Sequence, residues 1–479
     1  MAMTKKYYIT SAIPYVNAAP HIGHALEFVQ ADTIARYHKL LGEDVQLLSG
    51  GDENALKNVQ AAETAGEPVQ GFVDRNNLLF EELTKKLNCN YDIWQKGSDV
   101  KTHFPSSQKL WDLCDKNGDI YQKEYSGLYC LGCEAFYTPD ELNDQGECFE
   151  HPGKKLLEVK EKNYFFKLSK YQKQLIDLIE KDELKINPIE RKNEVLSFLK
   201  EPLQDISISR SNERAKNWGV PVPNDDTQRL YVWFDALNIY QSGIGFGSEE
   251  EKYNKYWPAD VHVIGKGITR FHAIYWPAFL LSAKLKVPKA LFIHGYFTVN
   301  GQKMSKTLGN VINPIDLIEK YGADALRYYF LAKFSPYTDG DFSEEKLKDV
   351  YNGELANGLG NLVSRVAKLA EKSELNFDSD ASMHHSLETD IVESLNNYRF
   401  DEALKVVWNK VTEVDKYIND NEPWKLEGEK LKEVLVSAVS SLRTLAFYLL
   451  PFLPDTAQKI DTQFKGPRIK SKEPLFPRI

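Results

Sequence analysis

The sequence predicts an α/β protein in which a doubly wound parallel sheet is split by an insertion and followed by an all-α helix bundle. Three observations carry this prediction. The chain opens with a strand, a loop, a helix and a second strand; strand character returns after a cysteine-bearing segment; and strand signals vanish beyond about residue 340. Strands that alternate with helices are typical of parallel sheets with helical crossovers.

The opening elements predict the first half of the sheet. Residues 7–13 form an apolar run with strand character, and apolar residues recur at helical spacing over residues 22–41. Gly42 is a natural helix stop. We expect a second short strand over residues 44–48 and a mostly helical stretch over residues 53–87.

The second half of the sheet is expected after a segment of different composition. Residues 117–228 hold a cysteine cluster, short strand-like runs and a charged helix over 170–184, and this segment is interpreted as an insertion. A helix is expected over residues 271–285. Strand character returns in three runs, at residues 230–234, 260–264 and 290–297.

Long amphipathic helices follow the sheet and predict a helix bundle. They are expected over residues 347–372, 386–397, 401–419 and 430–449. The tail, residues 464–479, is basic and contains proline but has little periodicity. The chain is therefore divided into four segments: the two halves of the sheet domain at 1–116 and 229–340, the insertion at 117–228, and the helical domain at 341–479.

Composition bounds the class of protein. A chain of 479 residues predicts roughly three domains. The net charge of −9, from 60 basic and 69 acidic residues, argues against indiscriminate coating of nucleic acid. No apolar run approaches the roughly 20 residues of a membrane-spanning helix. Five cysteines and no room for a signal peptide before the first strand favour a cytoplasmic, reducing location.

The first chemical signal lies at the start of the first helix, where His21 and His24 flank Gly23. Unpaired backbone N–H groups and the helix dipole favour anions at such an end. Gly23 has no Cβ, so a ligand can approach the backbone closely. The arrangement predicts a phosphate-binding surface. Two surface histidines near a helix cap are the alternative for this tetrapeptide alone.

The second signal is the loop Gly301-Gln302-Lys303-Met304-Ser305-Lys306-Thr307, which follows a predicted strand. Lys303 and Lys306 flank a small hydroxyl. Such a loop can place two ammonium groups against a polyphosphate, as nucleotidyl transfer requires when charge builds on the leaving group. A pair of lysines by itself is more typical of a solvated loop.

Taken together, the two signals resemble the two signatures of class I aminoacyl-tRNA synthetases, with Thr307 in a position where the family often has serine. Further segments resemble the methionyl-tRNA synthetases; they are residues 12–17, 231–237, 271–277 and 294–301. The resemblance implies a Rossmann-like catalytic domain and an ATP-dependent ligase. Such an enzyme converts L-methionine and ATP, with Mg²⁺, to methionyl-adenylate and then charges tRNA(Met).

The resemblance also implies roles for individual residues. His21, Gly23, His24, Lys303 and Lys306 would bind ATP, and the two histidines and two lysines would be catalytic. The methionine pocket would be built from Ile13, Tyr15, Asp52, Trp233, Ala236, Tyr240, Ile268, Phe271 and His272. Aromatic rings suit a polarizable thioether. The chain departs from the family at Asn54, where histidine is frequent, and at Gly267, where relatives commonly carry aspartate.

A third signal is a pair of Cys-x-x-Cys and Cys-x-x-His units. Cys130 and Cys133 precede Cys148 and His151, with 14 residues between the two units. Three thiolates and one imidazole at this spacing predict tetrahedral zinc with no open position, hence a structural Zn²⁺. The site resembles the single zinc knuckle of one subgroup of methionyl-tRNA synthetases.

The helical region holds a fourth signal. Asn361 and Arg365 are four residues apart on one helix face, and Trp424 follows Pro423. By resemblance these three residues bind the anticodon, because loop bases are recognised by stacking and by hydrogen bonds from arginine and asparagine. A salt-bridged helix and a packed tryptophan are the alternative.

Other classes of protein fit the sequence less well. The insertion is too short for the large editing domain of the isoleucine, valine and leucine enzymes. A cysteinyl enzyme needs zinc in its amino-acid pocket, whereas here the cysteines lie in the insertion. A synthetase-like RNA-binding protein without catalysis would carry decayed signatures. We expect a monomer that does not contact membranes.

Overall fold

The computed structural model describes residues 4–132, 135–137, 141–150, 153–299, 301–304, 309–377 and 386–479. The chain folds into two compact units. Unit 1 comprises Met1–Pro20, Glu43–Glu82 and Asn90–His294; unit 2 comprises His21–Gly42, Leu83–Cys89 and Gly295–Ile479. The division into four segments expected from the sequence stays a prediction, because unit 2 combines pieces of three of them.

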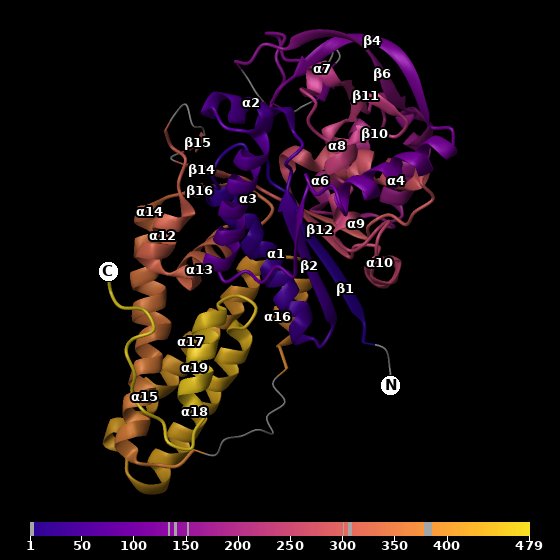
Figure 1. Ribbon diagram of the computed structural model, residues 1–479. Helices are drawn as coiled ribbons and strands as arrows, with labels where there is room; N and C mark the ends of the chain where they lie inside the picture. The colour runs from indigo at the N-terminus through magenta and orange to yellow at the C-terminus, as the bar shows by residue number, and fades with distance from the viewer. Residues whose placement is uncertain are drawn as a thin grey trace. The chain divides into compact units, whose positions relative to one another are not determined.

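A six-stranded parallel sheet forms the centre of unit 1 (Figure 1). Its order is β3-β2-β1-β12-β13-β7, so the chain winds outward from β1 in both directions. Ile9 of β1 aligns with Leu47 of β2 on one side and with Val261 of β12 on the other. The strands are β1 (Lys6–Ser11), β2 (Asp44–Gly51), β3 (Ile93–Lys96), β7 (Lys185–Asn187), β12 (Val261–Gly265) and β13 (Ala290–His294). This topology confirms the doubly wound α/β class.

One predicted strand of unit 1 is a helix in the structure. The prediction of a strand over residues 230–234 is wrong, because β11 ends at Leu230 and Val232–Ala236 form the short helix α8. All five residues of α8 are buried, and a short apolar run that is buried on every side has no periodicity to separate helix from strand. Outside the insertion, the other α- and π-helices that the structure describes in unit 1 are α2 (Leu56–Ala65), α3 (Val69–Lys86, with its last turn in unit 2), α4 (His103–Lys116), α9 (Ile239–Ser242), α10 (Glu250–Tyr256), a π-helix (Phe271–Tyr275) and α11 (Trp276–Ser282).

The insertion contributes two antiparallel sheets and also an edge strand to the central sheet. Strand β7 pairs with β13 in parallel, which the sequence analysis did not predict. The larger sheet, β5-β4-β6-β8, consists of Ala135–Tyr137, Ile120–Cys130, Leu157–Phe166 and Ile206–Ser207. The smaller sheet, β10-β11-β9, consists of Pro221–Val222, Asp225–Leu230 and Ser209–Ser211. The α-helices that the structure describes in the insertion are α5 (Gln172–Glu180), α6 (Ile189–Phe198) and α7 (Asn212–Ala215).

Unit 2 combines helix α1 (Ile22–Leu40) with a small sheet and a helix bundle. The predicted strand over residues 290–297 ends early at His294, and Phe297–Val299 (β14) pair instead with β15 (Gln302–Lys303) and β16 (Gly340–Phe342). The bundle helices α15, α17, α18 and α19 lie side by side (Figure 1). The helices are α12 (Pro314–Tyr321), α13 (Ala323–Lys333), α14 (Glu344–Val350), a π-helix (Tyr351–Gly360), α15 (Asn361–Ser373), α16 (Thr389–Asn396), α17 (Phe400–Asn421), α18 (Gly428–Leu449) and α19 (Pro454–Phe464).

The C-terminal tail packs on the bundle although it has no regular structure. The Tyr351 hydroxyl donates to the carbonyl of Pro477 over 2.8 Å, and the Ile479 amide donates to Asn352 Oδ1 over 3.1 Å. The tail therefore runs back along the helices that begin at Tyr351 (Figure 1).

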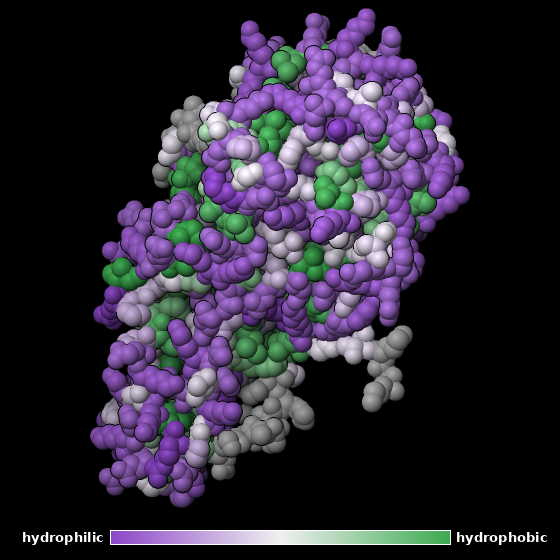
Figure 2. All heavy atoms as spheres, in the orientation of Figure 1, coloured by the Kyte–Doolittle hydropathy of each residue, from purple (hydrophilic) through white to green (hydrophobic). Residues whose placement is uncertain are grey.

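The face of the molecule that Figure 2 shows is mostly polar. Hydrophilic side chains cover most of β4, β6 and the bundle helices on the face that Figure 2 shows, and the hydrophobic patches among them are small. Among the helices that the structure describes, none has the length and apolar character needed to cross a membrane.

Candidate active site

Helix α1 of unit 2 begins with two histidines that cap it. The His21 amide donates to His24 Nδ1, and the Gly23 amide donates to His21 Nδ1, each over 3.1 Å. The two rings stack with centroids 3.9 Å apart. Because Nδ1 accepts a hydrogen bond in both rings, a neutral ring carries its proton on Nε2. The pair thus satisfies two amides of the helix end and keeps a donor nitrogen on each ring.

Both histidines are neutral near pH 7. Burial lowers the pKa of His21 to about 4. Burial, and repulsion by a charged His21, lower the pKa of His24 well below its usual range. Two neutral N–H donors at a helix N-terminus favour an anion such as a phosphate through hydrogen bonds and the helix dipole.

The structure shows a second reason why position 23 requires a glycine. A Cβ at this position would lie 2.9 Å from His21 Cε1, so the folded-back ring of His21 occupies the space that a side chain would need. The Met304 methyl would lie 3.7 Å from the same Cβ. The second signature therefore reaches the first at Met304 within unit 2.

The described residues contain only part of the second signature. The backbone of Lys303 ends the short strand β15, where it pairs with Thr298. Lys306 lies outside the described residues, so its ATP-binding and catalytic roles stay predictions, as do those of Lys303, His21, Gly23 and His24.

In unit 1 the apolar and aromatic residues expected to bind methionine belong to one cluster. Ile13, Tyr15 and Ile268 are partly buried and pack against a core that contains Trp233, Ala236, Tyr240 and Phe271. Trp233 and Phe271 stack with ring centroids 3.7 Å apart and an interplanar angle of 3°. Tyr15 meets Trp233 edge to face at 6.3 Å. The structure thus brings the rings of Tyr15, Trp233 and Phe271 together in one aromatic wall, and their role toward methionine stays a prediction.

His272 is held as a neutral acceptor beside Tyr240. Its Nδ1 lies 3.0 Å from the Ile268 carbonyl and must donate there, because a carbonyl only accepts. Nε2 then accepts from the Tyr240 hydroxyl over 2.8 Å. Burial lowers the pKa of His272 to about 4, so the ring stays uncharged at neutral pH. The short π-helix that carries Phe271 and His272 is a feature frequent at functional sites.

Asp52 follows the carboxyl end of β2, where ligands of open α/β sheets bind. Its amide donates to the Pro14 carbonyl over 2.9 Å, and a backbone bridge pairs it with Tyr15. Asn58 donates to the Asp52 carbonyl over 2.7 Å. The backbone of Asp52 is therefore fixed beside Tyr15, and its role toward a substrate ammonium stays a prediction.

Helix α8 carries a buried carboxylate, Asp235, that was not among the predicted site residues. Asp235 accepts hydrogen bonds from His103 Nε2 over 2.8 Å, from Ser107 Oγ over 2.9 Å and from Asn54 Nδ2 over 2.7 Å. Asn54, one of the departures from the family, also donates to the Gly97 carbonyl over 2.7 Å. No pattern in the sequence marks this network, because its members are joined only by the fold.

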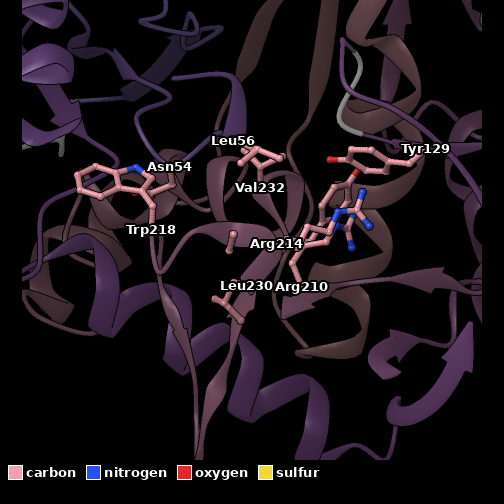
Figure 3. Close-up of a pocket in the computed structure, with 10 residues that line it drawn as sticks. Asn54, Leu56, Tyr129, Arg210, Arg214, Trp218, Leu230 and Val232 are labelled. Carbon is pink, nitrogen blue, oxygen red and sulfur yellow. The ribbon is translucent and has the colours of Figure 1, made fainter. Parts of the chain in front are cut away.

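Figure 3 shows a pocket between the start of α2 and the insertion. The Arg214 guanidinium lies over the Tyr129 ring at 4.0 Å, and that of Arg210 lies over the Tyr231 ring at 4.4 Å. Arg214 also pairs with Glu161 at 3.3 Å. The lining residues are Asn54, Leu56, Tyr129, Arg210, Arg214, Ala215, Trp218, Leu230, Tyr231 and Val232.

The described half of the predicted zinc site brings two thiols together. Cys130 Sγ and Cys148 Sγ lie 3.3 Å apart, and both residues are buried. Two sulfur ligands of one tetrahedral zinc ion lie about 3.8 Å apart. Cys133 and His151 lie outside the described residues, and within the described ones no group of three ligands is found. The geometry of the two thiols therefore fits the predicted site but does not complete it.

The residues expected to bind the anticodon lie at two places in the bundle of unit 2. Asn361 is exposed at the first position of α15. Arg365 pairs with Asp415 at 3.0 Å and donates to Asn419 Oδ1 over 2.8 Å. Trp424 is 51% exposed, so it is not a packed core residue. Their anticodon contacts stay predictions.

Comparison with known proteins identifies the class. The family model described as tRNA synthetases class I (M) matches residues 7–156 and 150–367, more than half of the chain. Together with the doubly wound sheet and the capping histidines, this places the chain among the class I tRNA synthetases.

Individual relatives narrow the family further. The chain is 40% identical to a methionine–tRNA ligase of Thermotoga maritima, over 98% of this chain and 77% of that protein. It is 38% identical to that of Brucella suis, over 95% and 91%. The structure matches Mycobacterium tuberculosis methionyl-tRNA synthetase in complex with methionyl-adenylate, with a TM-score of 0.92 and 35% identity over 99% of this chain and 100% of that one. The chain belongs to the methionine–tRNA ligase family.

Proposed function

We propose that this protein is a methionine–tRNA ligase. It activates L-methionine with ATP to give methionyl-adenylate and pyrophosphate, and then transfers the methionyl group to the 3′ terminal adenosine of tRNA(Met). The observation that carries the proposal is the match over nearly the whole chain to methionine–tRNA ligases, one of them solved with methionyl-adenylate.

The activation step needs charge stabilisation more than covalent catalysis. The methionine carboxylate attacks the α-phosphorus of ATP and forms a carboxyl oxygen–phosphorus bond. The bond between the α-phosphorus and the oxygen that bridges it to the β-phosphorus breaks, and pyrophosphate leaves. We assign the triphosphate to His21, Gly23 and His24 at the start of α1. Because Nδ1 of each histidine accepts from a backbone amide, the neutral Nε2–H groups would donate to the phosphates. Lys303 and Lys306 then compensate the charge that builds on the leaving pyrophosphate, which Mg²⁺ accompanies.

Methionine selection is assigned to the apolar cluster of unit 1. The thioether packs against the stacked Trp233 and Phe271, a favourable contact for a polarizable sulfur. The neutral His272–Tyr240 pair presents no charge to the apolar chain. Asp52 binds the substrate ammonium. One methylene in such a pocket is worth roughly 1–3 kcal/mol, so homocysteine is an expected misactivation problem.

A structural zinc ion is proposed for the insertion, with Cys130, Cys133, Cys148 and His151 as ligands. The approach of the two described thiols supports it. Zinc analysis tests it: wild-type protein should hold one equivalent, and Cys148→Ser should release it. The matched control is Cys114→Ser, because Cys114 is a buried thiol on α4 outside the predicted ligand set. Unchanged zinc in Cys148→Ser contradicts the ligand set.

Recognition of tRNA(Met) is proposed for the helical region through Asn361, Arg365 and Trp424. The half-exposed indole supports this, because a base stacks on an accessible aromatic face. The monomeric state and cytoplasmic location expected from the sequence stay predictions.

The experiment that tests the function is methionine-dependent ATP–pyrophosphate exchange, with the other amino acids measured beside it. Exchange with methionine alone is the expected result. Lys303→Ala should lower the rate at least tenfold while circular dichroism stays unchanged. Exchange with a different amino acid contradicts the pocket assignment. No exchange with any amino acid, from a folded and zinc-replete sample, favours a non-catalytic RNA-binding protein.

A further inference from the structure

Lys57 occupies an unfavourable place in helix α2. It lies in the first turn of the helix, where the backbone dipole disfavours a cation, and no acidic residue occupies that turn. Ordering a lysine side chain also costs rotamer entropy. A lysine held in this place therefore needs favourable contacts elsewhere.

Among the described residues, the Lys57 ammonium contacts Gly132 and Tyr15. Its Nζ donates to the Gly132 carbonyl over 3.1 Å. The same Nζ lies 3.1 Å from the centroid of the Tyr15 ring, which is the geometry of a close cation–π interaction. One charged group thus joins two segments that lie 117 residues apart in the sequence.

On one side, the ammonium contacts a turn of the insertion. Gly132 lies two residues after the end of β4, at Cys130. The Cys130 thiol lies 3.3 Å from that of Cys148, and both side chains are buried. The position of the Gly132 carbonyl is therefore set by a packed part of the insertion.

On the other side, the ammonium contacts the first member of the aromatic wall. The Tyr15 ring meets the edge of Trp233 at 6.3 Å and 85°, and Trp233 stacks on Phe271 at 3.7 Å. The backbone of Tyr15 is paired with Asp52 by an isolated bridge. A force on the Tyr15 ring therefore acts on the proposed methionine pocket.

We propose that Lys57 is a positioning residue that holds the Tyr15 ring against the aromatic wall and ties it to the Cys130–Gly132 turn of the insertion. This inference rests on the proposed function, because the pocket is assigned to methionine there. It predicts that methionine binding senses the conformation of the insertion through one ammonium group.

The test is a double-mutant cycle in methionine-dependent ATP–pyrophosphate exchange. Lys57→Met keeps the aliphatic stem and removes the cation. It should raise the KM for methionine about five- to tenfold, whereas the KM for ATP and kcat change less than threefold. In a Tyr15→Leu background, Lys57→Met should have no further effect on the KM for methionine. Lys57→Arg should restore most of the affinity, because a guanidinium also binds over an aromatic ring.

The matched control is Lys216→Met. Lys216 forms an ion pair with Glu63, so it also joins the insertion to α2, but it does not contact Tyr15 in the structure described. Its variant should keep the wild-type KM for methionine. Amide hydrogen exchange of peptides that end at the Gly132 turn should become faster in Lys57→Met and stay unchanged in Lys216→Met.

Three results would overturn the proposal. Equal effects of Lys57→Met in the wild-type and Tyr15→Leu backgrounds would mean that Lys57 acts independently of Tyr15. Equal increases in the KM values for ATP and methionine would indicate a general loss of structure. An equal increase in the KM for methionine in Lys216→Met would mean that Lys57 acts only by holding α2 in place. Because wild-type exchange with methionine is measured first, a failure of the proposed function is distinguished from a failure of this inference.

Discussion

The rings of Trp233 and Phe271 lie parallel with their centroids 3.7 Å apart, although the residues come from α8 and from the π-helix that follows β12. Each is at most 8% exposed. Two short buried helices therefore present one continuous aromatic surface. Because neither helix has an exposed face, packing against neighbouring side chains holds both rings in place.

Loss of this stack should weaken methionine binding more than it weakens the fold. Phe271→Leu should raise the KM for methionine about tenfold, since an aromatic pair contributes about 0.5–1.5 kcal/mol beyond its buried area. The matched control is Phe234→Leu on the same helix as Trp233. Phe234 packs instead against Phe279 at 4.7 Å, so this variant should lose stability and keep its KM within twofold. Equal KM values for both variants would contradict the assignment of the pocket.

Much of this architecture follows from sequence patterns. The strand–helix–strand opening and the bundle helices α15, α17 and α18 lie where periodicity places them, because amphipathic helices carry a strong local signal. The sequence does not mark the edge strand β7, which has three residues, or the buried helix α8. Both are decided by neighbours that are distant in the chain.

The candidate site was predictable to a similar extent. The identities of His21, His24 and the aromatic wall follow from motifs, but the capping arrangement of the histidines depends on backbone geometry. Lys57 and Asp235 were missed for a different reason. Their roles arise from contacts with Tyr15 and His103, and no spacing in a single sequence reports such contacts.

The buried histidine His272 predicts how stability changes with pH. In the unfolded chain its pKa is near 6.5, and in the fold burial lowers it to about 4. The unfolded state therefore binds more protons between these values, and the free energy of unfolding falls as the pH falls from about 6.5 to about 4. The loss from this one group is about 3 kcal/mol. Above pH 6.5 His272 is neutral in both states, so its titration takes nothing from the free energy of unfolding.

Urea unfolding at several pH values measures this effect. His272→Gln removes the titration, so its unfolding free energy should fall by about 3 kcal/mol less than that of the wild type over the same interval. His21, whose pKa is also lowered to about 4, adds to the wild-type slope and remains in the variant. Identical slopes for the two proteins would contradict the burial of a neutral His272.

The ion pair between Arg327 and Asp32 should be essential to the stability of unit 2. Arg327 Nη2 lies 2.7 Å from Asp32 Oδ2, and both side chains are at most 1% exposed. Arg327 also donates to the carbonyl of Phe452 over 2.7 Å, so it joins α13 to α1 and to the turn between α18 and α19. Arg327→Met leaves a buried carboxylate with less compensation and should cost about 3–5 kcal/mol of unfolding free energy.

A second substitution separates charge from packing. In the double variant Asp32→Leu with Arg327→Met the buried charge is gone, and part of the lost stability should return. Arg75→Met serves as the control, because its ion pair with Glu67 is largely exposed and should leave the melting temperature unchanged. A double variant less stable than either single variant would show that packing, and not charge, governs this site.

Substitution of Trp424 tests whether the helix bundle binds the anticodon of the tRNA. Its indole is 51% exposed in the turn after α17, so Trp424→Ala should leave the melting temperature almost unchanged. Stacking of one base on an aromatic ring contributes about 1–3 kcal/mol, which predicts at least a fivefold loss in kcat/KM for charging of tRNA(Met). Amino-acid activation occurs without tRNA, so pyrophosphate exchange should keep its wild-type rate. Val436→Ala, another exposed apolar side chain of the bundle, should change neither activity. Equal losses of charging and exchange in Trp424→Ala would mean that the indole supports the fold rather than the anticodon.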